Sequence, residues 1–344
     1  MKKFLILTLC VLLALPAFSM AEDSKVLHLM TWETYIDDET VAAFEQETGI
    51  DVIYTPMEYN EDILFKLNES GGAGFDLVLG SDYMLDILRK EELIQKLDLS
   101  ALSNYNNLDE NYLGKFYDEE NEYVIPYMSG SPLIVYDPAK VDFEITGYED
   151  LWNEKLVDSI AMIDDARVVV GITLKSMGKS FNETDPEVLA QAKEKLMPLY
   201  KNIRGLDYSS LQTMIVGGEA SVGFMFTSQV FLALMERPDL KVVEPKEGLG
   251  IGIDGLAIPS KAENVQNAHL FLDYLMRPEV AAHNAMWQGY ACVNKAAAPQ
   301  LTEDYTNNPA VKVSPEMVQT AEFIQDIGET ATIFQEIFTE FKLQ

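Results

Sequence analysis

Side chains that could bind a small cation recur beside the segments that the sequence predicts as β-strands. Aromatic rings and carboxylates occupy these positions, and basic residues do not. Rings attract ammonium groups and cover methylenes, and carboxylates accept hydrogen bonds from N–H donors, so this mixture suits an alkyl cation. The candidates are Trp32, Thr34, Tyr35, Ser81, Asp82, Tyr83, Asp165, Phe226 and Asp254.

The strength of such contacts sets the number of charges that the ligand needs. A cation–π contact contributes about 0.5–2 kcal/mol and a hydrogen bond to a charged group about 1.5–3 kcal/mol. Micromolar binding requires about 8 kcal/mol. One ammonium group does not reach that value once the entropy cost of binding is subtracted. We therefore expect a ligand with at least two cationic ends.

Alternating strands and helices would position these side chains. Strands are predicted at 26–30, 51–54, 75–79, 123–127, 133–136, 159–163, 221–226 and 255–259. Helices are predicted at 39–48, 60–68, 82–90, 148–152, 185–199, 268–275 and 278–287. This alternation indicates α/β architecture with parallel strands covered by helices. Open α/β sheets bind ligands outside the carboxyl ends of their strands, and the candidates follow predicted strands, except Asp254, which precedes one.

Motifs of enzymes and cofactor sites are absent or out of context. There is no HExxH, CxxC, GxSxG or Walker A sequence, and the three histidines are scattered. Gly250, Gly252 and Gly255 have the spacing of a dinucleotide fingerprint, but a strand follows them, so phosphate would lack a helix N-terminus. Asp164 and Asp165 lack the further ligands of a metal site. We expect no catalytic residue, no cofactor and no metal.

Composition indicates an acidic globular protein. The chain has 344 residues, of which 48% are hydrophobic and 24% charged. This length predicts two domains. Acidic residues number 56 and basic residues 25, which gives a net charge of −31. Such a surface repels phosphate backbones, so we expect no nucleic-acid partner, whereas it attracts cations.

The N-terminus has the pattern of a secretory signal. Lys2 and Lys3 precede an apolar run at 4–15, and Ser19-Met20-Ala21 forms a small-x-small cleavage site, which predicts a signal peptide at 1–21. Its removal changes the net charge from −31 to −33. Cys10 lies inside the apolar run rather than at the cleavage point, which disfavours a lipid anchor. We expect a periplasmic protein in which Cys292 has no disulfide partner.

An ordered series of short motifs runs through the chain. The motifs lie at 32–35, 44–50, 52–54, 75–78, 81–83, 125–127, 164–167, 254–259, 275–278 and 289–290. No single motif is specific, but the ordered set resembles the bacterial spermidine/putrescine-binding proteins. The resemblance implies a two-lobed periplasmic binding protein fold of type II, without catalysis. It also implies a monomer that delivers a polyamine to the permease of an ABC transporter in the inner membrane.

The same resemblance implies where the lobes and the site lie. Each lobe would hold a mixed sheet flanked by helices, with 22–128 and 254–298 in lobe 1 and 129–253 and 299–344 in lobe 2. The ligand would lie in the interlobe cleft. Asp254 would pair with one amine and Asp165 with another, and Trp32 and Tyr290 would pack on the alkyl chain. Tyr35, Ser81 and Tyr83 would complete the lining.

Three positions depart from the family pattern. Phe226 and Gly252 stand where the family has tryptophan, and Val168 stands where it has glutamate. The departures widen the expected site and remove a carboxylate, so the choice among spermidine, putrescine and another cation stays open. The alternatives are a protein of the same fold for another small cationic solute, an exported enzyme, or a ligand-binding component of a chemoreceptor.

Overall fold

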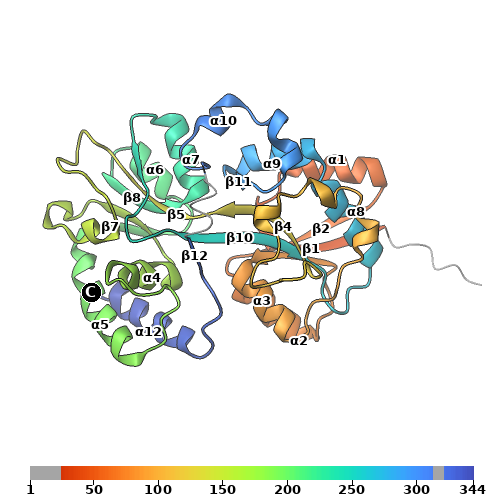
Figure 1. Ribbon diagram of the computed structural model, residues 1–344, viewed down its shortest axis with the longest axis horizontal. Helices are drawn as coiled ribbons and strands as arrows, with labels where there is room; N and C mark the ends of the chain where they lie inside the picture. The colour runs from red at the N-terminus through yellow and green to blue at the C-terminus, as the bar shows by residue number, and fades with distance from the viewer. Residues whose placement is uncertain (1–24, 313–320) are drawn as a thin grey trace, which may run out of the picture.

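The computed structural model describes residues 25–312 and 321–344, so the predicted signal peptide at 1–21 lies outside the described residues. Two β-sheets, each flanked by helices, form two lobes joined by extended segments (Figure 1). Both sheets contain parallel and antiparallel pairs, which confirms the predicted mixed α/β architecture. None of the helices within the described ranges is long and apolar enough to cross a membrane.

The sheet of lobe 1 has the strand order β11-β4-β10-β3-β1-β2, with β12 paired to β10. Its strands are β1 (Val26–Trp32), β2 (Asp51–Met57), β3 (Leu77–Ser81), β4 (Val124–Gly130), β10 (Gly250–Ala257), β11 (Ala291–Cys292) and β12 (Glu322–Phe323). Its helices are α1 (Asp38–Thr48), α2 (Glu61–Ser70), α3 (Asp82–Lys90), α8 (Val265–Leu275) and α9 (Pro278–Gln288). β1 is parallel to β2 and β3, whereas β10 is antiparallel to β3 and β4.

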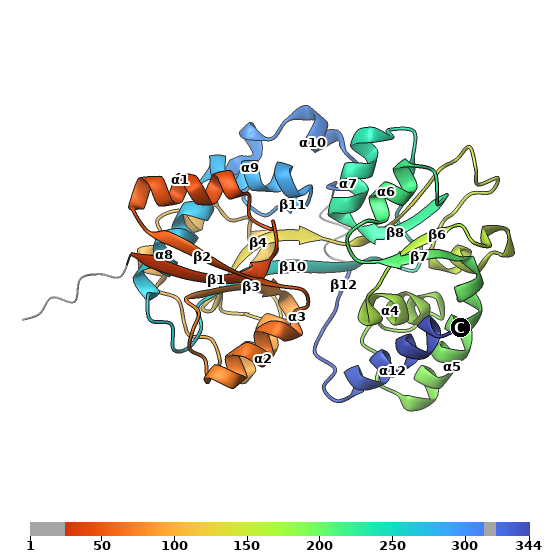
Figure 2. The same ribbon diagram turned by 180° about the vertical axis from the view of Figure 1, so that it is seen from behind.

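The sheet of lobe 2 has the order β7-β6-β8-β5-β9. Its strands are β5 (Pro132–Tyr136), β6 (Ile160–Ile163), β7 (Ile203–Asp207), β8 (Val222–Phe226) and β9 (Lys241–Val243). Its helices are α4 (Ala166–Ser176), α5 (Pro186–Leu196), α6 (Leu211–Val216), α7 (Thr227–Glu236), α10 (Glu303–Asn307) and α12 (Thr330–Lys342). Figure 2 shows the C-terminal helix α12 beside α4 and α5, so the end of the chain returns to this lobe.

Each lobe has its own hydrophobic core. In lobe 1, Phe44 of α1 packs edge-to-face on Phe271 of α8 with ring centroids 4.8 Å apart. In lobe 2, Phe224 of β8 and the α12 side chains Phe334 and Phe341 are fully buried. Two separate cores hold the lobes as distinct bodies and leave their facing surfaces available for a ligand.

Helix starts place several of the candidate residues. Asp165 is the N-cap of α4, and its side chain accepts a hydrogen bond from the backbone N–H of Val168. Ser81 is at the N-cap position of α3, but its side chain makes no capping bond. Gly289 ends α9 at a φ of 68°, a left-handed conformation that favours glycine. The left-handed turn at Gly289 therefore directs the next residue, Tyr290, towards the space between the lobes.

Three expectations about secondary structure need correction. The helix predicted at 185–199 ends at Leu196 and continues as a 3₁₀ helix, because Pro198 cannot donate the next α-helical hydrogen bond. The helix predicted at 148–152 is a 3₁₀ helix. β10 begins at Gly250 rather than at 255, so Asp254 lies inside a strand and not before it. Among the described residues, sequence patterns also missed five α-helices (α4, α6, α7, α10 and α12) and four short strands (β7, β9, β11 and β12).

Candidate functional site

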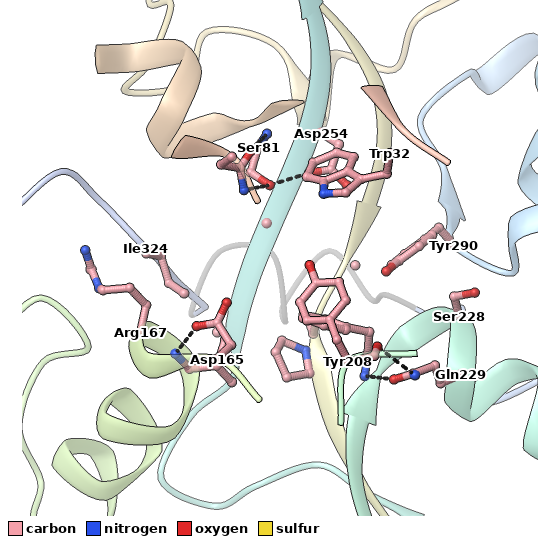
Figure 3. A pocket seen from close by; sticks show the side chains of 18 of the residues that line it. Trp32, Ser81, Asp165, Arg167, Tyr208, Ser228, Gln229, Asp254, Tyr290 and Ile324 are labelled. Atoms are coloured by element: carbon pink, nitrogen blue, oxygen red, sulfur yellow. Dashed lines mark hydrogen bonds between the residues drawn. The ribbon is translucent and has the colours of Figure 1, made fainter. Parts of the chain in front are cut away.

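A cavity of about 660 Å³ lies between the lobes (Figure 3). Its wall includes residues from the ends of strands in both sheets. The structure brings all ten predicted site residues to this wall: Trp32, Thr34, Tyr35, Ser81, Asp82, Tyr83, Asp165, Phe226, Asp254 and Tyr290. Residues separated by more than 250 positions in the chain therefore meet around one cavity between the lobes.

Asp254 of β10 is a carboxylate of the wall whose two oxygens both accept hydrogen bonds from hydroxyl groups. The hydroxyl of Tyr35 donates to one oxygen, and the Ser81 hydroxyl donates to the other over 2.8 Å. Asn60 holds Ser81 in place, since its Oδ1 accepts from the Ser81 N–H at 2.9 Å and its Nδ2 donates to the Ser81 Oγ at 3.2 Å. Burial raises the pKa of Asp254, and these two hydroxyl donors oppose the rise.

Asp82 and Tyr83 have supporting contacts of different kinds. Asp82 is 2% exposed, and its oxygens accept from the backbone N–H groups of Tyr83 and, over 3.0 Å, of Ile253. This carboxylate thus fastens the start of α3 to β10, and burial raises its pKa well above the usual range. The Tyr83 hydroxyl donates to Glu61 at 3.1 Å. Asp82 therefore positions β10, the strand that carries Asp254, while Tyr83 lines the cavity.

Aromatic rings form the lobe 1 side of the cavity. The Trp32 and Tyr35 rings meet edge-to-face at 5.1 Å, and Tyr35 lies 6.0 Å from Tyr290. Tyr290 packs directly over Gly130, where an added Cβ would lie 2.5 Å from its ring. Thr34 adopts a φ of 60°, an uncommon value for a β-branched residue, in the turn that follows Trp32 at the end of β1. These rings offer π-faces and apolar area in the same place.

Asp165 supplies a carboxylate from lobe 2. Its Oδ1 accepts from the Val168 N–H at 2.9 Å, and Figure 3 shows the carboxylate directed into the cavity. Burial raises its pKa, and the charge of Glu61 adds to the rise. The neighbouring Asp164 is different, because it pairs with Lys342 at 2.8 Å and does not line the cavity. Of these two adjacent aspartates, Asp165 lines the cavity and Asp164 forms an ion pair at the surface.

Two glycines of β10, Gly250 and Gly252, line the cavity and add no side chains to its floor. Gly250, Gly252 and Asp254 alternate along β10 and so share one face of the strand. A Cβ on Gly252 would meet nothing nearer than the Gly130 carbonyl oxygen, at 4.0 Å. An extended ligand can lie against this face, with one end at the carboxylate of Asp254. The apolar Val168 and Phe226 line the lobe 2 side.

Sequence reasoning missed several residues of the wall, among them Asn60, Tyr208 and Arg167. Arg167 corrects the expectation that basic residues are absent. Its Nη2 donates to the Asn182 Oδ1 and the Gln325 carbonyl oxygen, both at 3.1 Å, and its guanidinium lies 5.1 Å from the Phe334 ring centroid. These contacts commit Arg167 to holding the C-terminal segment on lobe 2. Burial lowers its pKa.

Groups of metal-ligand type lie outside the cavity. Among the described residues, Asp37, Glu39 and His283 bring their ligand atoms within 4.8 Å of one another. Asp37 caps α1 and contacts His283 at 2.5 Å, so it already has structural partners. His28, His269 and His283 all lie away from the cavity wall. The wall therefore offers carboxylates, hydroxyls and rings, but no imidazole for proton transfer.

Comparisons with known proteins agree with this geometry. The family model of the bacterial extracellular solute-binding proteins matches residues 39–313. The spermidine/putrescine-binding periplasmic protein of Salmonella typhimurium is 34% identical over 323 residues, which cover 94% of this chain and 93% of the relative. A putrescine-binding periplasmic protein of Escherichia coli is 32% identical over 320 residues, covering 87% of this chain and 86% of that protein.

Solved structures show the same architecture. A protein from Listeria monocytogenes has a TM-score of 0.87 and 32% identity, covering 93% of this chain and 99% of that chain. The spermidine/putrescine ABC transporter substrate-binding protein of Streptococcus pneumoniae has a TM-score of 0.81 and 30% identity, with the same coverage. The type II periplasmic binding protein fold is thereby confirmed. The chain belongs to the family of bacterial extracellular solute-binding proteins that includes the spermidine/putrescine-binding periplasmic proteins.

Proposed function

We propose that this protein captures a polyamine, spermidine or putrescine, outside the cytoplasm and delivers it to an ABC transporter. The observation that carries the proposal is a pair of partly buried carboxylates in one cavity, Asp254 from lobe 1 and Asp165 from lobe 2, with aromatic rings in the same wall. A molecule with an ammonium group at each end can satisfy both carboxylates and thereby hold the lobes together. The names of the relatives point to the same ligands.

The proposed roles follow from the contacts around each residue. Asp254 binds one terminal ammonium group, because Tyr35 and Ser81 hold its oxygens in place. Asp165 binds the other. Trp32 and Tyr290 cover the methylene chain, and Tyr83 and Phe226 close the sides. Thr34 shapes the turn between Trp32 and Tyr35, and Asp82 holds β10 and with it Asp254.

Another small cationic solute is the main alternative, and the charges of the wall limit it. An amino acid would need a cation for its carboxylate. Arg167 is the basic residue of the wall, but its guanidinium is bonded to Asn182 and Gln325 and stacked on Phe334. The carboxylates of the wall outnumber this one guanidinium, which favours a ligand with two positive ends over a zwitterion.

The absence of a nucleophile–base arrangement in the wall supports binding without catalysis. General acid–base chemistry most often uses histidine, and none of the three histidines lies in the lining. The proposed setting is the periplasm, after cleavage of the segment 1–21, with the protein as a monomer. Its proposed partner is the permease of an ABC transporter, which recognises the two lobes closed on the ligand. A chemoreceptor could use the same closure.

Native mass spectrometry of the purified protein, followed by titration calorimetry, tests the proposal. The ligands to titrate are spermidine, putrescine and a set of amino acids. We expect a co-purified polyamine mass and micromolar or tighter binding of at least one polyamine. Binding of amino acids but of no polyamine would overturn the proposal. Chemical conversion of the bound amine would overturn the assignment as a binding protein without activity.

A further inference from the structure

β11, which begins directly after Tyr290, is an edge strand of the lobe 1 sheet. β4 pairs with one side of it through Ala291 and Cys292, and the other side has no neighbouring strand among the described residues. The free edge of a strand presents backbone N–H and C=O groups, which need partners when they are buried. A tyrosine side chain from α10, which lies beside β11 in Figure 1, takes the place of a further strand.

The Tyr305 hydroxyl makes two hydrogen bonds with this free edge. It donates to the backbone oxygen of Tyr290 and accepts from the backbone N–H of Cys292 at 3.1 Å. A phenol can do both at once, because its oxygen carries one proton and also has lone pairs. Tyr305 is 4% exposed and does not line the cavity, so it acts on the cavity only through the residues that it holds.

Lobe 2 holds Tyr305 in place. Its ring packs on Phe231 of α7 with centroids 5.8 Å apart, and both side chains belong to the lobe 2 core. The side chain of Asn308, just after α10, donates to the Phe231 backbone oxygen at 3.3 Å. Phe231 also packs on Gly289, where an added Cβ would overlap its ring. Tyr305 and Phe231 together therefore contact the chain directly before and after the Tyr290 side chain.

The Tyr290 ring depends on this support because its place in the wall is confined. The ring packs over Gly130, where an added Cβ would lie 2.5 Å from it, and its centroid lies 6.0 Å from that of Tyr35. β11 is two residues long, so its pairing with β4 does little to fix the ring. A ring that is ordered before the ligand arrives costs less entropy on binding than one that must be ordered then. Without the Tyr305 hydroxyl, two buried backbone groups would lose their partner and the segment would loosen.

We propose that Tyr305, supported by Phe231, is a positioning residue that fixes the Tyr290 ring in the cavity wall from the opposite lobe. Tyr305 does this without contact with the ligand. This inference rests on the proposed function, in which the Tyr290 ring covers the alkyl chain of the amine. The affinity for the amine then depends on hydrogen bonds made outside the cavity, and this dependence passes through the Tyr290 ring.

A double-mutant cycle, measured by calorimetry with spermidine and with putrescine, tests the proposal. Tyr305→Phe keeps the ring and removes the hydroxyl that bonds Tyr290 and Cys292. We expect it to weaken the binding of the amines about fivefold to tenfold, the scale of one hydrogen bond. In a Tyr290→Ala background, the same substitution should change the affinity by less than about twofold, because the ring that Tyr305 positions is gone.

Tyr274→Phe is the matched control in lobe 1. The Tyr274 hydroxyl donates to the backbone oxygen of Thr40 at 3.2 Å, and this buried side chain lies away from the cavity wall. Each of the two phenylalanine variants should lower the melting temperature by about 2–4 °C, whereas only Tyr305→Phe should lower the affinity. An equal loss of affinity in Tyr274→Phe would mean that destabilisation alone weakens binding, which would overturn the proposal.

Two further results would overturn the proposal and leave the proposed function intact. They are wild-type affinity in Tyr305→Phe, and an equal loss of affinity with and without the Tyr290 ring. If the wild type bound neither spermidine nor putrescine, the proposed function would fail, and the proposal with it. Should Tyr305→Phe not fold, Phe231→Leu replaces it in the cycle, because this variant keeps both hydroxyl bonds and removes the ring behind them. The same non-additive losses are then expected.

Discussion

Single residues of the same type have different tasks in this cavity because their partners differ. Asp254 accepts hydrogen bonds from two hydroxyl groups, and Asp165 accepts one from a backbone N–H. The two oxygens of Asp82 each accept a hydrogen bond from a backbone N–H. Asp164, next to Asp165, is neutralised by Lys342. Exposure to the cavity, rather than residue type, determines which carboxylate can bind an ammonium group, because Asp82 is buried whereas Asp165 and Asp254 are partly exposed.

Asparagine at either anchor should weaken polyamine binding. We expect Asp254→Asn to cost about 2–5 kcal/mol of binding free energy, because a buried ammonium group loses its charged partner. Asp165→Asn should also weaken binding while it keeps the cap of α4, since asparagine caps helices as well as aspartate does. The matched control is Asp164→Asn, which should bind like the wild type in calorimetry. Wild-type affinity in Asp254→Asn would show that this residue is not the anchor.

Binding should weaken as pH falls towards the raised pKa values of Asp254 and Asp165. Amines keep their protons in this range, so protonation of the carboxylates removes the attraction. Calorimetry in buffers of different ionisation enthalpy should detect proton release on binding at mildly acidic pH. In Asp254→Asn, fewer protons should be released. An affinity that is flat down to the pKa of an ordinary carboxyl group would contradict the prediction.

The same raised pKa values have the opposite effect on the ligand-free protein. A carboxyl group whose pKa is raised by folding contributes stability that is present below its unfolded pKa and is lost as pH rises through its folded pKa. Asp254→Asn should therefore increase the free energy of unfolding of the ligand-free protein at neutral pH while it weakens binding. Denaturant melts at neutral and acidic pH measure this difference, which should shrink in acid.

At the scale of elements, β4 and β10 connect the two halves of the site. Gly130 and Gly252 face each other in the β4–β10 ladder, yet their surroundings differ. A Cβ at 130 would lie 2.5 Å from the Tyr290 ring, whereas a Cβ at 252 would lie 4.0 Å from its nearest neighbour. The close approach of Tyr290 requires glycine at one of these positions and not at the other.

Alanine at these two positions should have unequal effects. We expect Gly130→Ala to lower the free energy of unfolding by about 1–3 kcal/mol, the cost of overpacking, and to weaken ligand binding because the Tyr290 ring must move. The control Gly252→Ala should stay within about 0.5 kcal/mol of the wild type, as for substitutions away from close contacts. Equal destabilisation of both variants in denaturant melts would show that Tyr290 does not pack on Gly130 as described.

At the scale of the whole molecule, the net charge of −31 acts on a cationic ligand before contact. The Debye length is about 30 Å at 0.01 M salt and about 8 Å at 0.15 M, so salt screens the approach much more than the buried pairs. We expect the association rate of spermidine to fall about tenfold over this range while the dissociation rate changes little. Stopped-flow tryptophan fluorescence measures both rates, and Trp32→Phe identifies the reporting ring. Equal salt effects on the two rates would contradict electrostatic steering.

Local sequence patterns determined the order of most elements and the identity of some residues of the wall. Strand ends are recognisable where an apolar run stops at polar or aromatic residues, as at Ser81 and Asp165, and such ends must meet at one edge of a sheet. β7 escaped because Arg204 and Gly205 interrupt its apolar pattern, and with β7 unseen, Tyr208 did not stand at a strand end. Asn60 escaped because its role is to hold Ser81.

Tertiary structure alone decided which members of the pattern are available to a ligand. The sequence treats Asp82, Asp164, Asp165 and Asp254 alike, since residue type carries no record of distant partners. Folding brings Ile253 to Asp82 and Lys342 to Asp164, and leaves Asp165 and Asp254 facing a shared space. Contacts between segments far apart in the chain therefore made the selection, because they bury Asp82 and pair Asp164 with a lysine, while Asp165 and Asp254 stay partly exposed to the cavity.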